Sequence, residues 1–367
     1  MQKNQQYTTI LLQISKKYCN FARFYIYCVY CISMESIINK IYKLFNRKPE
    51  VDYSASFVDV TTWQEAQQYQ TGGTREKRWL IHPTNYSYYF FKISIKKEVM
   101  DYPSEFWMEI ITSKIGKLLG LEMLDYNIAK RNNMIGCISK NMVDKEGYAL
   151  TELMYFLMGY QSTYNPESNQ DKFTIQFVYD ALEHYGLEKF MPKYIETLLF
   201  DCIIGNQDRH QENWGIITPT KTSQEIKSKK DKNISWKEAK VAPIYDSGSS
   251  LGREQNENKI IQMLRDKNMM EAYINRYKPE VRLVEGKKIR YDELVQHLLA
   301  DKHYNTLTKR IIDKFVNAYD IDQVTYIVNH IDDNLPNEYN AFKLTTARKE
   351  FVINLMTQRL NKLKTFI

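Results

Sequence analysis

Three polar side chains in the middle of the chain have types and a spacing that could do chemistry on phosphate groups. Asp208 is followed five positions later by Asn213, and Asp246 comes after a lysine-rich insertion. Hard divalent cations bind oxygen ligands, and Mg²⁺ usually takes only one or two of them from the protein while phosphates and water supply the rest. Asn213 and Asp246 fit that need, which leaves Asp208 free to act as a base. The ordinary alternative, in which each of the three caps a helix or makes a turn, stays open.

Apolar segments flank these residues and predict the elements that position them. A helical run at 194–205 leads into the polar loop that holds Asp208, and the loop closes on a short apolar segment at 214–217. A second strand-like run, at 241–244, leads to the turn that holds Asp246. This arrangement is typical of a fold that holds an acid and an amide at the mouth of a pocket.

The spacing of these residues also carries a family resemblance. Asp-Arg-His-x-x-Asn, from Asp208 to Asn213, followed by Ala-Pro-Ile-Tyr-Asp-Ser-Gly-Ser-Ser-Leu at 242–251, resembles the active-site signature of the HipA-like kinases, including the shorter CtkA-type members. The resemblance implies a serine/threonine protein kinase that depends on ATP and Mg²⁺. In such an enzyme Asp208 would take the proton of the acceptor hydroxyl, while Asn213 and Asp246 would hold Mg²⁺. Ser247 stands where ordinary protein kinases have the phenylalanine of Asp-Phe-Gly.

Lys92 is a charged residue inside an apolar strand, at 89–93, where a lysine is expensive unless it is paired. The resemblance implies that Lys92 holds the α and β phosphates of ATP and pairs with a carboxylate on a helix, for which Glu109 is the candidate. The alternative is a lysine that points outward from an edge strand.

A glycine-bearing turn precedes one of the predicted strands. Gly73, Thr74, Arg75 and Lys77 resemble the phosphate loop of HipA-like kinases, in which backbone N–H groups approach phosphate oxygens. Gly-Gly is also simply a common turn sequence, so the loop alone does not decide the function.

The segment at 138–143 reads as the linker between two lobes, because it follows the last predicted strand and precedes a helical region. In the resemblance, the backbone near Asn141 and Met142 would meet the adenine edge of the nucleotide.

The order of predicted elements points to a fold class. Short apolar or alternating runs separated by turn residues predict strands at 57–60, 78–81, 88–95, 126–129 and 134–139. One helix interrupts them, from about Pro103 to Leu119. We therefore expect an α+β, bilobal, protein-kinase-like fold, with a strand-rich nucleotide-binding lobe at 51–143 and a mainly helical catalytic lobe at 144–367.

Within the second lobe, helical patterns near the C-terminus predict helices at 291–299, 308–316 and 342–363. The stretch at 218–240 holds seven lysines against three acidic residues, and we expect it to be an exposed hairpin or flexible insertion.

The first residues predict less structure than the rest. The uncharged apolar run at 24–34 is 11 residues long, whereas a membrane-spanning helix needs about 20. A helix is expected at 34–50, directly after Met34. Our hypothesis is that translation starts at Met34 and that residues 1–33 are an upstream extension.

The composition is that of an ordinary folded protein, with 43% apolar and 26% charged residues. The net charge of +7 is spread along the chain and therefore indicates no specific nucleic-acid site. Cys137 and Cys202 lie inside apolar segments, as buried thiols do in a reducing compartment. We expect a cytoplasmic protein without a membrane segment, with a secreted effector as the alternative.

The expected partner is a protein substrate that offers a serine or threonine hydroxyl. About 36 residues separate Met34 from Thr71, which is too little for the additional N-terminal subdomain of HipA, so an antitoxin-like partner is not assumed. Two alternatives remain open: a small-molecule or lipid kinase of the same fold, and a non-catalytic module that only holds nucleotide.

Overall fold

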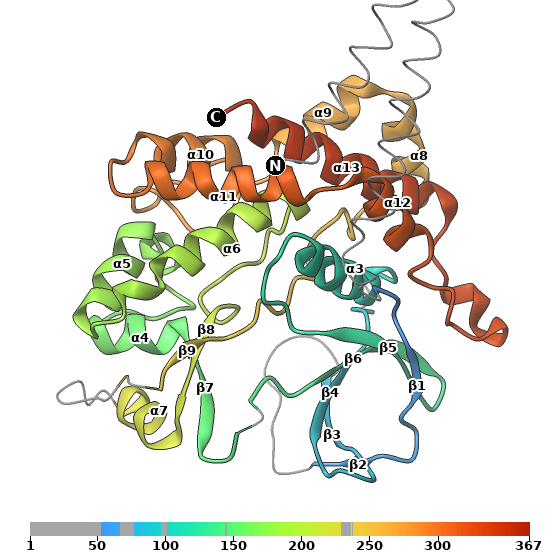
Figure 1. Cartoon of the computed structure of the whole chain (residues 1–367), viewed down its shortest axis with the longest axis horizontal. Helices are drawn as coiled ribbons and strands as arrows, with labels where there is room; N and C mark the ends of the chain where they lie inside the picture. Colours follow the sequence, from blue (N-terminus) through green and yellow to red (C-terminus); the bar gives the residue numbers. More distant parts are fainter. Residues whose placement is uncertain (1–52, 67–76, 97–100, 144, 229–235, 237) are drawn as a thin grey trace, which may run out of the picture. The chain divides into compact units, whose positions relative to one another are not determined.

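The computed structural model describes residues 53–66, 77–96, 101–143, 145–228, 236 and 238–367. The chain divides into two units, Met1–Tyr53 and Ser54–Ile367, and every labelled element of Figure 1 belongs to the second unit. The extension at 1–33, the start at Met34 and the helix expected at 34–50 lie outside the described residues.

A six-stranded sheet comes first in the second unit (Figure 1). Its strands lie in the order β1 (Phe57–Asp59), β5 (Tyr126–Arg131), β6 (Met134–Lys140), β4 (Tyr88–Lys92), β3 (Lys77–Ile81) and β2 (Gln64–Glu65). β1 and β5 are parallel, and the other neighbours are antiparallel. Alternate residues of a strand point to the same face, so neighbouring strands share one buried core. Its residues are Val60, Leu80, Phe91, Ala129 and Ile138.

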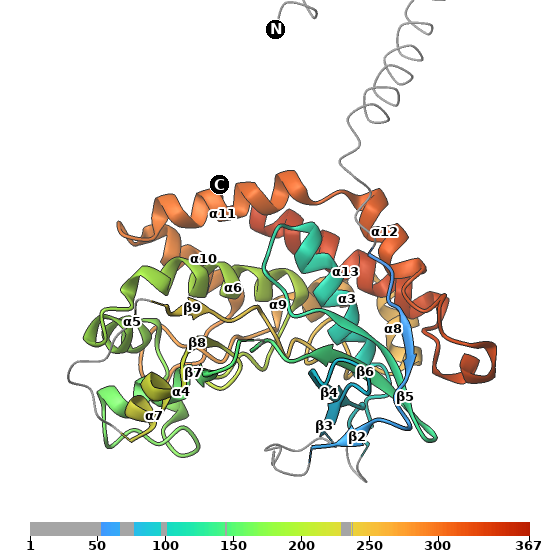
Figure 2. The ribbon, with the colours of Figure 1, turned by 60° about the horizontal axis from the view of Figure 1, so that its bottom comes forward.

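One helix of this part, α3 (Glu105–Leu118), packs against β5 and β6 (Figure 2). Gly120 follows it with a φ of 74°, a left-handed conformation that suits glycine at a helix end. The helix expected from about Pro103 to Leu119 is thus confirmed. Most of its residues are buried, since α12 (Ile321–Asn329) packs on it as well.

A second, three-stranded antiparallel sheet consists of β7 (Tyr148–Glu152), β8 (Gly215–Pro219) and β9 (Lys240–Val241). Figure 2 shows α4 (Leu153–Tyr160) and α7 (Thr220–Lys227) beside it, and both helices contact β7.

The helix α7 (Thr220–Lys227) corrects the expectation of a hairpin or flexible insertion at 218–240. Thr222, Ser223 and Ile226 are buried on one face of this helix, and the Ser223 hydroxyl lies 2.8 Å from that of Thr151 on β7. This buried face could not be predicted from the charges, because both lysines of the helix, Lys221 and Lys227, are exposed. Residues 229–235 and 237 lie outside the described residues.

Helices make up most of the remaining chain. They are α4 (Leu153–Tyr160), α5 (Ile175–His184), α6 (Met191–Ile204), α8 (Glu257–Arg265), α9 (Lys267–Asn275), α10 (Tyr291–Ala300), α11 (Asn305–Ala318) and α13 (Thr346–Lys364), with short 3₁₀ helices at Gln170–Lys172, Glu188–Phe190 and Asn337–Phe342. The expected helices at 291–299, 308–316 and 342–363 correspond to α10, α11 and α13.

The helices α8, α9 and α12 were not predicted. Each has only nine residues, and only two or three of them are buried, so the apolar pattern is too short to stand out. α13 begins at Thr346 rather than at 342, because the Thr345 side chain accepts a hydrogen bond from the Arg348 N–H and caps the helix there.

Candidate active site

Lys92 is buried and contacts carboxylates from two distant parts of the chain. It ends β4, only 3% of it is exposed, and its Nζ contacts Glu109 Oε1 on α3. The same amine donates to Oδ1 of Asp246 at 2.8 Å. Asp246 lies 154 positions later in the chain. Burying a lysine is costly unless a charge partner compensates it, and here two carboxylates do so. Lys92 therefore does not point outward: it contacts Glu109, its expected carboxylate partner, and also Asp246, which was not predicted as its neighbour.

The turn after Asp246 is fixed by Glu109 as well. Glu109 Oε2 accepts a 2.9 Å hydrogen bond from the Ser247 N–H. A Cβ atom on Gly248 would lie 2.9 Å from Glu109 Oε1, which is closer than real contacts allow. Asp246 itself has a φ of 51°, an unusual left-handed conformation for a residue other than glycine. Glycine at 248 lets the turn pack directly on the helix carboxylate, which a larger residue would displace.

Arg209 joins the loop at 208–213 to the turn at 246–248. Its guanidinium is 1% exposed and forms a two-pronged ion pair with Asp201 of α6, at 2.9 and 3.1 Å. Nη1 donates to the carbonyl oxygens of Asn213, at 2.8 Å, and Tyr245, at 2.6 Å. Nη2 donates to Ser247 Oγ at 2.9 Å. Ser247, at the position of the usual phenylalanine, thus accepts a hydrogen bond from Arg209 that a phenylalanine side chain could not accept.

Asp208, the expected base, is held from both sides while its side chain stays 44% exposed. Its Oδ2 accepts a 3.1 Å hydrogen bond from Ser249 Oγ, and its N–H donates to Asn206 Oδ1 at 3.1 Å. His210 Nε2 lies 3.7 Å from Asp208 Oδ1. A positioned carboxylate that remains accessible can accept a proton from a second molecule.

Asn213 uses its amide nitrogen inside the loop. Nδ2 donates to the Asp208 carbonyl oxygen at 2.6 Å and lies 3.2 Å from His210 Nε2. The amide oxygen is then the atom that can face a cation. Together with the carboxylate of Asp246 it makes a pair of hard oxygen donors, which suits Mg²⁺ when phosphates and water complete the shell. Among the described residues there is no group of three or more His, Cys, Asp or Glu side chains that could hold a metal ion.

Three expected nucleotide-binding residues, Gly73, Thr74 and Arg75, lie outside the described residues. Lys77 begins β3 and pairs across the sheet with Lys92. In the linker after β6, the Asn141 N–H donates to the Tyr88 carbonyl oxygen at 2.9 Å. That donor is already used, so the Asn141 carbonyl group and the Met142 backbone are the candidates for an adenine edge.

Glu152 and Ser249 belong to the same region, and neither was predicted as a site residue from the sequence. Glu152 ends β7 opposite Gly215, just after the loop. Burial and the neighbouring Glu212 carboxylate raise the pKa of Glu152 to about 7, against the opposing charges of Lys227 and Lys77. The Ser-Gly-Ser-Ser run gave a signal for Ser249, whereas nothing in the sequence around Glu152 marked its burial.

Two comparisons place this geometry beside known proteins. The chain is 22% identical over 279 residues to the serine/threonine-protein kinase CtkA of Helicobacter pylori strain J99, over 74% of each protein. The crystal structure of the H. pylori proinflammatory kinase CtkA superimposes with a TM-score of 0.66 and 20% identity, over 84% of this chain and 97% of that one. The fold is therefore kinase-like. This confirms the α+β kinase-like fold and the resemblance to CtkA that the motifs predicted.

The other comparisons give a lower structural similarity to HipA and no matching family model. HipA from the toxin–antitoxin complex of Shewanella oneidensis MR-1 with HipB and operator DNA reaches a TM-score of 0.44 at 11% identity, over 90% of this chain and 70% of that one. That score is too low to carry an argument. No family model matches the chain. In the part of the chain that the structure describes, no helix is long and apolar enough to span a membrane.

Proposed function

We propose that this chain is a phosphotransferase, an ATP- and Mg²⁺-dependent serine/threonine protein kinase of the HipA-like type. The observation that carries the proposal is the contact of Lys92 with Glu109 and Asp246, which joins three charged groups from distant parts of the chain. A lysine held by a helix carboxylate, next to a metal-binding aspartate, is the arrangement that kinases use to clamp phosphates. The similarity to the kinase CtkA supports it.

In this proposal Lys92 neutralises charge on the α and β phosphates of ATP, and Glu109 holds the amine in place. Gly73, Thr74, Arg75 and Lys77 would also contact the phosphates, and the backbone at Asn141 and Met142 would meet the adenine. Mg²⁺, when bound, neutralises charge on the phosphates, and the oxygens of Asn213 and Asp246 would hold it. Phosphoryl transfer asks the protein mainly for positioning and charge neutralisation.

Asp208 would orient the acceptor hydroxyl and take its proton. The hydrogen bond from Ser249 fixes one carboxylate oxygen, which leaves the other for the acceptor. Because the Asp208 side chain is partly exposed, the acceptor can be a side chain of another protein, and we propose a serine or threonine.

The test is transfer of ³²P from [γ-³²P]ATP to protein acceptors by the wild type, Asp208→Ala, Asp246→Ala and Lys92→Met, with an equilibrium measurement of ATP binding beside it. We expect each substitution to lower the rate by at least about 100-fold. Asp208→Ala should still bind ATP with Mg²⁺, whereas Asp246→Ala should bind it more weakly.

Other outcomes would overturn the proposal in distinct ways. Transfer only to alcohols or lipids in a substrate panel would show a small-molecule kinase. ATP binding without any turnover in the wild type would show a non-catalytic nucleotide-binding module.

A further inference from the structure

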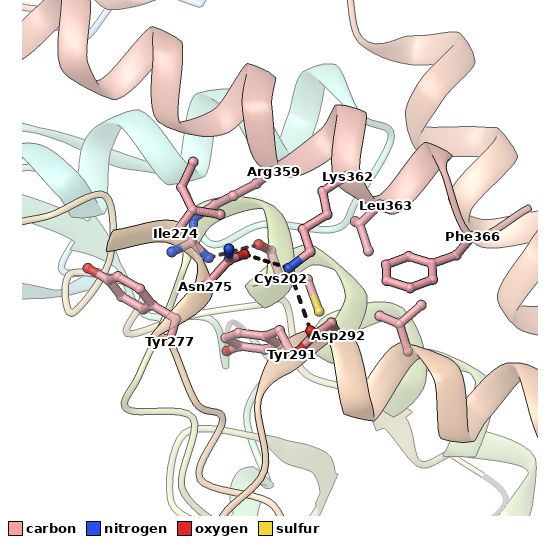
Figure 3. A pocket seen from close by; sticks show the side chains of 11 residues that line it. Cys202, Ile274, Asn275, Tyr277, Tyr291, Asp292, Arg359, Lys362, Leu363 and Phe366 are labelled. Carbon is pink, nitrogen blue, oxygen red and sulfur yellow. Dashed lines mark hydrogen bonds and ion pairs between the residues drawn. The ribbon is translucent and has the colours of Figure 1, made fainter. Parts of the chain in front are cut away.

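A small cavity lies between α6, α9, α10 and α13, on elements that hold none of the proposed nucleotide ligands (Figure 3). Apolar side chains such as Ile274, Leu363 and Phe366 line it together with two cationic ones, Arg359 and Lys362. Its volume is about 30 Å³, by a measure in which one water molecule needs roughly 10 to 15 Å³. The space therefore excludes a nucleotide or a metabolite and admits one small ion with a water molecule.

The guanidinium of Arg359 is the unusual feature of this cavity. Only 4% of the residue is exposed, and its Nη1 donates to the Cys202 carbonyl oxygen at 3.2 Å. Its Nε and Nη2 are buried and have no hydrogen-bond partner among the described residues. Buried charged donors are normally paired, so two unused ones mark a place for an acceptor.

The groups around Arg359 offset only part of its charge. The ring of Tyr277 lies 4.2 Å from the guanidinium carbon. The C-terminal end of α6, which includes the Cys202 carbonyl, contributes a partial charge of roughly −0.5. Asp292 also lines the cavity, but it is paired with Arg290 at 3.0 Å and lies 3.7 Å from Lys362. None of these groups satisfies Nε or Nη2.

We propose that this cavity binds a small inorganic anion of the chloride class, held by Arg359 at its inner end. Lys362 lies toward solvent, with 37% of its side chain exposed, and gives the entrance a positive charge. A monoatomic anion suits the volume, accepts hydrogen bonds from Nε and Nη2, and tolerates the apolar side chains on the other walls.

The site adjoins the loop that holds Asp208. A Cβ atom on Gly205, the residue that ends α6, would lie 2.7 Å from Arg359 Cζ, so the guanidinium packs against the backbone there. The hydroxyl of Tyr291, another lining residue, donates to the Asn206 carbonyl oxygen, and Asn206 Oδ1 accepts from the Asp208 N–H. An anion bound to Arg359 therefore stabilises the loop that holds Asp208, through the backbone at Gly205 and Asn206. Its effect on turnover rests on the proposed function, whereas its binding does not.

Bromide locates the site directly in crystals of the full chain. Crystals grown in sodium bromide should give an anomalous difference peak in the cavity within about 3.5 Å of Arg359 Nε, a hydrogen-bonding distance for a large anion. A cavity that holds only water under these conditions would overturn the proposal. This experiment needs no variant, so it decides the question even if substitutions at Arg359 prevent folding.

Thermal unfolding tests the same site in solution. The wild type should melt about 2 °C higher in sodium chloride than in sodium gluconate of equal ionic strength, because gluconate is too large to enter. Arg359→Gln should lose this difference. The control is Arg348→Gln, a buried arginine of the same helix that is paired with Glu257 at 2.7 Å and should keep the difference. A chloride effect that persists in Arg359→Gln would contradict the assignment.

The kinase assay separates binding from its consequence. Turnover of the wild type should be faster in chloride than in gluconate, whereas Arg359→Gln should turn over at the same rate in both salts. If the chain shows no kinase activity at all, the bromide peak and the melting shift still decide whether the anion binds.

Discussion

The guanidinium of Arg209 donates a 2.6 Å hydrogen bond to the carbonyl oxygen of Tyr245, 36 residues further along the chain. Because the same nitrogen also donates to the Asn213 carbonyl oxygen, one side chain fixes the spacing between the proposed metal ligands Asn213 and Asp246. The relationship explains why a fully buried arginine lies beside the site. It also makes Arg209 the first residue to test.

Arg209→Lys keeps the charge but loses the planar fork that serves four partners at once. We expect the phosphorylation rate to fall on the order of 100-fold, since small misplacements of catalytic groups have effects of this size. Circular dichroism should still show a folded protein. Arg290→Lys, which changes an exposed arginine paired with Asp292, is the matched control and should leave the rate unchanged. Equal activity of Arg209→Lys and wild type would refute the joining role.

Gly248→Ala should weaken ATP binding. The new Cβ would lie 2.9 Å from Glu109 Oε1 and displace the carboxylate that holds Lys92. We expect the KM for ATP to rise about 10-fold or more, since a displaced lysine neutralises the phosphates less well. Gly286→Ala carries a backbone cost that Gly248→Ala lacks, since the φ of Gly286 is 77°, but no atom lies within 4 Å of the added carbon. If both variants change the KM equally, crowding of Glu109 is not the cause.

Ser249→Ala removes the hydroxyl that donates to Asp208 Oδ2. The proposed base then loses a fixed orientation, so kcat should fall about 10-fold while the KM for ATP stays the same. Steady-state kinetics separate the two constants. Ser228→Ala, an exposed serine bonded to the Glu225 carbonyl oxygen, is the control and should change neither. A change confined to the KM would place Ser249 in nucleotide binding instead.

Glu152 should make stability depend on pH. Its pKa is raised from 4.5 to about 7 in the folded state, first by burial and then by Glu212. Between these two values the folded state binds more protons than the unfolded state, so the free energy of unfolding falls as pH rises through the window. We expect Glu152→Gln to remove about 1 to 3 kcal/mol of this fall.

Urea unfolding of both proteins at pH 5 and pH 8 measures that difference. Glu146→Gln, which alters an exposed glutamate near the start of β7, should keep the pH dependence of the wild type. A Glu152→Gln variant that loses stability between pH 5 and pH 8 as the wild type does would show that Glu152 is not the group involved.

Much of the fold could be predicted because its signals are local. The strand at 88–92 is marked by a run of four aromatic residues, and α3 begins after Pro103 and ends before Gly120, so neither needed knowledge of distant residues. The short helices α8, α9 and α12 could not be predicted. Each has only two or three buried residues, and which of its residues are buried depends on the surfaces that it packs against.

The sequence by itself determined which residue types stand at 208, 213 and 246, and the spacing within one loop that leaves Asp208 and Asn213 hydrogen-bonded to each other. Only the tertiary structure decided that Lys92 meets Asp246 across 154 residues, that burial raises the pKa of Glu152, and that Arg359 faces a cavity with two unused donors. The physical reason is the separation along the chain over which each interaction acts. Backbone geometry fixes neighbours along the chain, whereas burial and charge pairing depend on which surfaces the helices and sheets bring together.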